Sequence, residues 1–165
     1  MERKFYEFCQ NNSGGNFHVD DKICHRLFIE AKNSFEANAI AEDLGIYFDG
    51  VENDIDCSCC GDRWNESWNH INIEKWKEEG YDVSIYSHYE NSEQLWYDKY
   101  GKYIIIKKPE WINKDKSYTS FNGKIAFRDI EEYAQYVSND FGWTSPDTRI
   151  FYKDGTVKEI FKNKY

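Results

Sequence analysis

The sequence predicts an α+β fold: a mixed, mainly antiparallel sheet with about three helices packed on it and a C-terminal β-hairpin. Short segments rich in β-branched and aromatic residues alternate with capped amphipathic segments, so both strands and helices are expected. Asp154-Gly155 lies between residues 149–153 and 156–161 and predicts the hairpin, with a type I′ turn. The chain has 165 residues and no linker that divides it. We therefore expect residues 1–165 to form a single domain.

Four short apolar segments in the first third of the chain predict strands. Aromatic and β-branched side chains supply their apolar content, and turn residues separate them. The predicted strands are residues 4–10, 17–19, 26–31 and 46–49.

A helix is predicted directly after residues 26–31. Asn33 is followed three residues later by Glu36, which is the arrangement of a capping box. The apolar positions that follow lie on one helical face, and they are Ala37, Ile40, Ala41 and Leu44. The helix should end at Gly45, because glycine readily adopts the left-handed conformation found after many helices.

The second half of the chain repeats this alternation. The predicted strands are residues 81–87, 102–108 and 124–127, and the predicted helices are residues 73–79, residues 91–100 and a segment capped by Asp129. Asp129 has Glu132 three residues later, again as in a capping box. The apolar stripe of this last helix extends to Phe141.

The chain is acidic, with a net charge of −9. Nucleic-acid binding needs a basic face for the phosphates, so general binding to DNA or RNA is not expected. An acidic surface suits a basic protein partner, or it serves only solubility. Aromatic residues make up 18% of the chain, and they either fill a β-rich core or form a recognition surface.

The chain lacks the signals of membrane insertion and secretion. No segment approaches the ~20 consecutive apolar residues of a membrane-spanning helix. Residues 1–5 are not followed by the apolar run of a signal peptide, so none is expected. We therefore expect a cytoplasmic protein without membrane association. Its five cysteines should then be reduced thiols or metal ligands.

The most distinctive local feature is a cysteine-rich turn within the long polar loop of residues 51–70. Cys57 and Cys60 have C-x-x-C spacing and are followed by glycine, as in half of a zinc knuckle. Cys24 and His25 are the best candidates for the other two ligands of a structural zinc ion. The alternatives are a reduced turn with a purely structural role and a redox or catalytic use of the thiols.

Residues on both sides of this turn form a candidate binding cluster for a ligand or partner. Its members are Tyr47, Asp49, Asp62, Arg63 and Trp64. Arginine offers a planar fork of donors, and tryptophan offers a stacking face. In the alternative interpretation, Asp62 and Arg63 make a surface contact while Trp64 packs the loop onto the domain.

No complete catalytic motif is present. A phosphate-binding glycine loop, a G-x-S-x-G elbow and an H-x-x-x-H pair are all missing from the sequence. Acidic pairs such as Glu131-Glu132 are typical of the first turn of a helix, where the helix dipole favours negative charge. These absences favour a non-enzymatic function and leave catalytic residues unassigned.

Two segments carry a resemblance to known proteins. Residues 37–51 (ANAIAEDLGIYFDGV) and residues 56–64 (DCSCCGDRW) resemble a family of small uncharacterised proteins of tailed bacteriophages, with the D-C-x-C-C-G-D-R-W turn as the most specific part. Residues 128–134 and 154–159 fit the same resemblance. It implies a phage accessory protein acting in the host cytoplasm, and such proteins commonly work by binding host machinery.

Three functions are compatible with these observations. The first is inhibition of a host defence or host-takeover protein by binding to it. The second is sequestration of a nucleotide-derived immune signal, which would favour a homo-oligomer with pockets between subunits. The third is a zinc- or thiol-dependent enzyme centred on residues 57–60.

Overall fold

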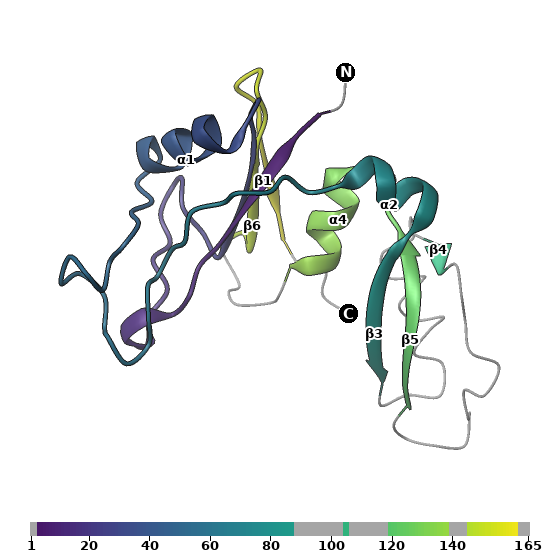
Figure 1. Cartoon of the computed structure of the whole chain (residues 1–165), viewed down its shortest axis with the longest axis horizontal. Coiled ribbons are helices and arrows are strands. Elements are labelled where there is room, and N and C mark those ends of the chain that lie inside the picture. Colours follow the sequence, from purple (N-terminus) through teal and green to yellow (C-terminus); the bar gives the residue numbers. More distant parts are fainter. Residues whose placement is uncertain (1–2, 88–103, 106–118, 139–144, 162–165) are drawn as a thin grey trace. The chain divides into compact units, whose positions relative to one another are not determined.

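The described strands form two sheets rather than the one expected from the sequence. The structure is a computed structural model that describes residues 3–87, 104–105, 119–138 and 145–161 (Figure 1). The predicted α+β class and the C-terminal hairpin are confirmed. The chain divides into two units, Met1–Ile71 with Val137–Tyr165 and Asn72–Tyr136, and each unit has its own sheet.

The first unit contains a mixed four-stranded sheet in the order β1-β2-β6-β7. Its strands are β1 (Phe5–Cys9), β2 (Arg26–Glu30), β6 (Thr148–Phe151) and β7 (Val157–Ile160). β2 pairs antiparallel with β1 and parallel with β6, with Phe28 opposite Ile150. This parallel pairing joins segments more than a hundred residues apart, so local sequence patterns could not reveal it.

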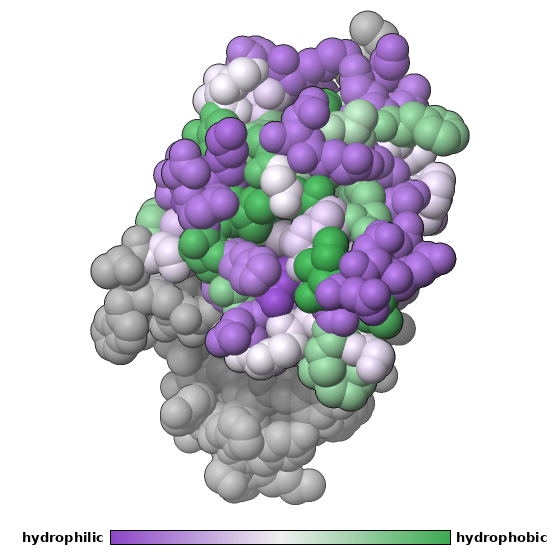
Figure 2. All heavy atoms as spheres, turned by 90° about the vertical axis from the view of Figure 1, so that its left-hand side faces the viewer, coloured by the Kyte–Doolittle hydropathy of each residue, from purple (hydrophilic) through white to green (hydrophobic). Residues whose placement is uncertain are grey.

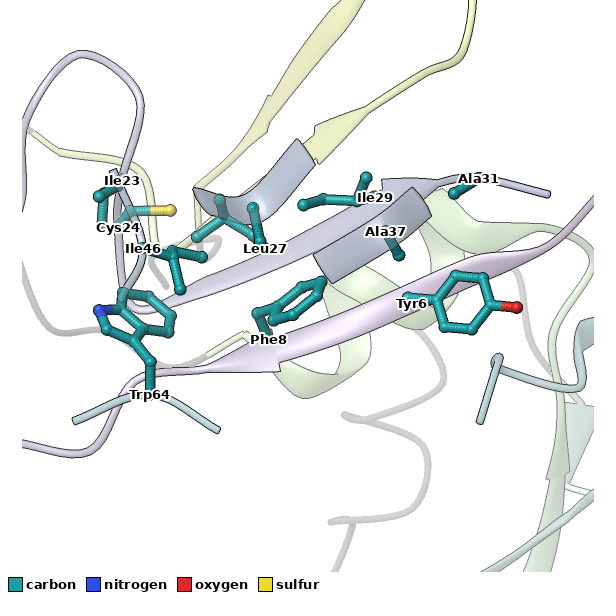
Figure 3. Close-up of a cluster of buried hydrophobic side chains, with 11 residues drawn as sticks. Tyr6, Phe8, Ile23, Cys24, Leu27, Ile29, Ala31, Ala37, Ile46 and Trp64 are labelled. Atoms are coloured by element: carbon teal, nitrogen blue, oxygen red, sulfur yellow. The ribbon is translucent and has the colours of Figure 1, made fainter. Parts of the chain in front are cut away.

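The core of the first unit lies between this sheet and helix α1 (Ser34–Asp43). Successive side chains of a strand point to opposite faces, so Tyr6 and Phe8 of β1 face the same side as Leu27 and Ile29 of β2. Figure 3 shows these side chains gathered with Ala37 of α1, and Trp64 lies at one end of the cluster. Each fully buried large apolar side chain contributes about 1.5–3 kcal/mol to stability.

The predicted ends of α1 are confirmed. The Asn33 side chain accepts a hydrogen bond of 2.9 Å from the amide of Glu36. At the other end, the Gly45 amide donates to the Glu42 carbonyl and the Ile46 amide donates to the Ala41 carbonyl. This pair of bonds is a Schellman motif, and Gly45 supplies the positive φ of 107° that the motif requires.

Two predicted short strands are absent, because other groups take their backbone hydrogen bonds. In residues 17–19, the His18 amide donates to the side chain of Gln10 at 2.6 Å. In residues 46–49, the first amide is already used in the Schellman motif, and Asp49 has a φ of 55° that no strand tolerates. Both segments therefore form loops.

The hairpin turn differs from the predicted type I′ turn. The Gly155 amide donates to the Tyr152 carbonyl, and the Tyr152 amide donates to the Thr156 carbonyl. Gly155 has a φ of 92°, whereas Asp154 is not in the positive-φ region. The connection is therefore a three-residue loop with a glycine bulge, the next most common hairpin solution.

The second unit contains an antiparallel sheet in the order β3-β5-β4, with helices α2 and α4. The elements are α2 (Ile73–Glu79), β3 (Tyr81–Ser87), β4 (Ile104–Ile105), β5 (Thr119–Ala126) and α4 (Ile130–Val137). Trp76, Tyr81, Phe127 and Tyr133 pack together, with ring centroids 4.5–6.3 Å apart. Aromatic residues thus build a core here, as one of the two interpretations expected.

Several predicted elements of the second half extend beyond the described residues. The predicted helix at 91–100, most of the strand at 102–108 and the end of the last helix at Phe141 lie outside them. β5 begins at Thr119, earlier than the predicted start at residue 124. Within the described part of the chain, no helix is long and apolar enough to cross a membrane.

Candidate functional site

The cysteine-rich loop is fixed to the first unit by the buried guanidinium of Arg63. Its Nη1 donates to Gln10 Oε1 (3.0 Å) and to the Asn16 carbonyl (2.5 Å). Its Nη2 donates to the Ser13 carbonyl (2.6 Å), and its Nε donates to the hydroxyl of Tyr47 (3.1 Å). One side chain therefore joins the loop to segments about 16 to 53 positions away.

Asp56 is the acidic partner inside the same loop. Its side chain is only 2% exposed, and Oδ1 lies 3.8 Å from Arg63 Nε. Oδ1 accepts from the Tyr47 hydroxyl (2.6 Å), and Oδ2 accepts from the Arg63 amide (2.7 Å). Burial and the hydrogen bond to Asp56 raise the pKa of Tyr47. A Cβ on Gly50 would lie 2.0 Å from Asp56 Oδ2, so only glycine fits there.

The cysteine turn, defined here as residues 57–61, is held from both sides. The amides of Cys60 and Gly61 donate to the Cys57 carbonyl at 3.2 and 3.0 Å. The Cys57 amide donates to Ser13 Oγ, and the Asn11 side chain donates to the Cys60 carbonyl at 2.7 Å. Gly61 has a φ of 86°, which favours glycine at this position. The backbone of the turn is thus fixed by protein groups.

Three thiols gather on this turn. Cys57 Sγ lies 2.6 Å from Cys59 Sγ, and Cys59 Sγ lies 3.6 Å from Cys60 Sγ. All three side chains are exposed, and their sulfur atoms lie within 4.8 Å of one another, so this cluster could hold a metal ion. Hydrogen bonds from Cys59 and from backbone amides lower the pKa of Cys57 to about 7, while hydrogen bonds with Cys57 and Cys60 raise the pKa of Cys59 to about 11.

The structure replaces Cys24 and His25 with Cys59 in the candidate ligand set. Cys24 is fully buried, its thiol donates to the Arg26 carbonyl at 3.2 Å, and burial raises its pKa to about 11. His25 is buried against Phe17, with ring centroids 4.4 Å apart, and burial lowers its pKa. Neither residue belongs to the thiol cluster. The C-x-x-C spacing predicted Cys57 and Cys60 as ligands and left out Cys59, which directly precedes Cys60 in the sequence.

The candidate binding cluster around the turn also needs correction, because two of its members are buried. Arg63 and Trp64 are 5% and 1% exposed, so they hold the loop on the unit instead of facing a partner. Asp62 Oδ1 accepts from the Val51 amide at 2.9 Å. Tyr47 is partly buried by its contacts with the same network, and only Asp49 is clearly exposed.

Two exposed aromatic side chains form a surface feature that the sequence did not single out. Phe35 on α1 and Trp68 are 76% and 61% exposed. Asn38 lies one turn after Phe35, and it exchanges two hydrogen bonds (2.9 and 3.1 Å) with the backbone of Ser67, the neighbour of Trp68. These hydrogen bonds hold the segments that carry Phe35 and Trp68 together, and the two residues are here called the aromatic pair. Phe35 lies off the apolar stripe of α1, and this position is the sequence feature that indicates its exposure.

The face of the first unit that carries α1 and the loop is largely hydrophilic. Figure 2 shows hydrophilic residues over most of this face, with hydrophobic residues gathered between them. Exposed charged residues of the same two segments are the acidic Glu42, Asp43 and Glu66 and the basic Lys32.

Comparison with known proteins gives a family without an assigned role. A family model described as a domain of unknown function (DUF7296) matches residues 3–112. No curated protein and no solved structure matches the chain.

Proposed function

The chain belongs to the DUF7296 family, and we propose that it is a non-enzymatic protein that acts by binding a basic protein through its aromatic pair. The observation that carries this proposal is the exposure of Phe35 (76%) and Trp68 (61%) on two segments of the first unit that hydrogen bonds hold together. Removal of such a ring from water contributes about 1.5–3 kcal/mol of favourable free energy. Tryptophan and other aromatic residues are also frequent among the residues that dominate binding energy at interfaces.

The charge of the protein supports a basic partner. The net charge is −9, and Glu42 and Asp43 of α1 and Glu66, two residues before Trp68, are exposed. Complementary charge accelerates association and disfavours acidic partners. A basic nucleic-acid-binding enzyme has this chemistry.

The proposed setting is infection by a tailed bacteriophage. The resemblance of residues 56–64 to the D-C-x-C-C-G-D-R-W turn of tailed-phage proteins supports it. In this setting the protein acts in the host cytoplasm and inhibits a host defence or host-takeover protein by occupying its basic surface. No catalytic step is required.

Sequestration of a nucleotide signal receives less support. That function needs a Tyr or Trp ring for the base and an Arg or Lys side chain for the phosphate, and the cation of the candidate binding cluster is Arg63. The donors of Arg63 are instead engaged by Gln10, Ser13 and Asn16 within the loop network.

Affinity capture from host lysate tests the proposal. We expect the wild-type protein to retain a basic protein, and retention should weaken as salt rises because the charges are screened. The double variant Phe35→Ser/Trp68→Ser should lose this protein, whereas Val157→Ser, which changes an exposed apolar residue of β7, should retain it. The proposal is contradicted if the double variant Phe35→Ser/Trp68→Ser captures as much of the basic protein as Val157→Ser does. Stabilisation by cyclic or NAD-derived nucleotides in a thermal-shift screen would favour the nucleotide function instead.

A further inference from the structure

The thiol cluster of Cys57, Cys59 and Cys60 is a separate feature from the aromatic pair. We propose that the cysteine turn binds one thiophilic metal ion, Cu(I) in preference to Zn(II), at an exchangeable surface site with three sulfur ligands. This inference does not depend on partner binding, since it uses different residues.

The positions of the sulfur atoms suit a shared ion. Metal–thiolate bonds of about 2.3 Å place the sulfurs of one coordination sphere about 3.8–4.0 Å apart. Cys59 and Cys60 are already at 3.6 Å, while Cys57 and Cys59, at 2.6 Å, must separate by about 1.3 Å. All three side chains are exposed, so each is free to change its χ1 rotamer.

The backbone that carries the ligands is already in place. Ser13 and Asn11 hold the two ends of the turn, and the Arg63–Asp56 network holds the loop that follows. Classical zinc fingers differ, because their chains fold only when the metal binds. A metal ion at this turn therefore adds little to folding and can enter and leave from solvent.

The ligand set selects the metal. Among the described residues, no histidine, aspartate or glutamate joins the three cysteines within 4.8 Å. The nearby carboxylates of Asp56 and Asp62 accept hydrogen bonds from the Arg63 and Val51 amides. Thiolate ligands suit both Cu(I) and Zn(II), but structural zinc sites are closed by four protein ligands. Three exposed thiolates without a fourth protein ligand fit Cu(I) better.

Titration of the reduced, metal-free protein with Cu(I) tests the proposal. Under anaerobic conditions, a chromophoric Cu(I) chelator such as bathocuproine disulfonate competes with the protein and reports stoichiometry and affinity. We expect one tightly held ion per chain and ultraviolet thiolate-to-copper absorption. Single replacement of Cys57, Cys59 or Cys60 by serine should weaken binding by more than about 100-fold, because even outer-shell changes cost about 10–100-fold.

The matched control is Cys9→Ser, which removes an exposed cysteine on β1 and should leave Cu(I) affinity unchanged. Circular dichroism of every variant should show the wild-type fold. The proposal is overturned if Cys59→Ser binds Cu(I) as tightly as the wild type, or if Cys9→Ser is weakened equally. It is also overturned if the protein prefers Zn(II) and unfolds when a chelator removes it, since the turn would then be the structural zinc site expected from the sequence.

Discussion

Replacement of Arg63 by methionine tests how the loop is held. The variant keeps most of the apolar stem but loses the hydrogen bonds to Gln10, Ser13, Asn16 and Tyr47. It also leaves the Asp56 carboxylate, 2% exposed, without its neighbouring cation. Removal of one partner of a buried ion pair costs about 3–5 kcal/mol. This loss is a large share of the 5–15 kcal/mol that typically separates folded from unfolded protein.

The matched control is Arg3→Met in the same unit. Arg3 also pairs with a carboxylate, Glu30 at 2.7 Å, but its side chain is 60% exposed. Exposed pairs contribute about 0–1 kcal/mol, so this variant should be close to the wild type. Urea unfolding followed by circular dichroism gives the free energies of unfolding.

A comparison of the two variants decides the outcome. If Arg63→Met destabilises the protein by no more than Arg3→Met, the loop is not held by the Arg63–Asp56 network. A second Asp56→Asn change should cost less in the Arg63→Met background than in the wild type, because the two side chains share one network.

Three further predictions concern the loop, the first helix and the buried histidine. Gly50→Ala should destabilise the protein by more than about 2 kcal/mol in urea unfolding, because its Cβ would meet the Asp56 carboxylate at 2.0 Å; an unchanged stability would contradict this packing. Asn33→Ala should cost about 1 kcal/mol through loss of the cap on the Glu36 amide, and a neutral effect would show that the cap is unimportant. Burial lowers the pKa of His25 below its usual 6.5, so the unfolded chain binds the proton more readily. The stabilisation from the neutral, buried His25 is fully present above about pH 6.5, and it should be lost as the pH falls below that value. In the His25→Gln variant the free energy of unfolding should change less over this range, and an identical pH dependence would contradict the assignment.

Local features of the fold were predictable because their causes lie within a few residues. The caps at Asn33 and Asp129 and the helix end at Gly45 depend on neighbouring amides and carbonyls, and all three are observed. The strands at 4–10 and 26–31 followed from aromatic and β-branched content. Residues 17–19 and 46–49 have similar content but form loops, since their backbone amides are used elsewhere.

The candidate site was less predictable, because its geometry depends on contacts between distant segments. The residues around Cys57 correctly predicted the position of the cysteine turn. Nothing local indicates that Arg63 is buried, since its partners in residues 10–16 lie about 50 positions earlier in the chain. The burial of Cys24 likewise follows from its place in the core of the first unit, which no spacing rule reveals. Division of the strands into two sheets also depends on long-range pairing.

Amide hydrogen exchange of the metal-free protein tests the central claim most directly. The claim is that protein contacts, and not a metal ion, hold the cysteine turn. We predict slow exchange at Gly61 and Arg63, whose amides donate to the Cys57 carbonyl at 3.0 Å and to Asp56 at 2.7 Å. Cu(I) should change these rates little. Exchange at the rate of an unstructured peptide, with protection only after a metal ion is added, would contradict the account.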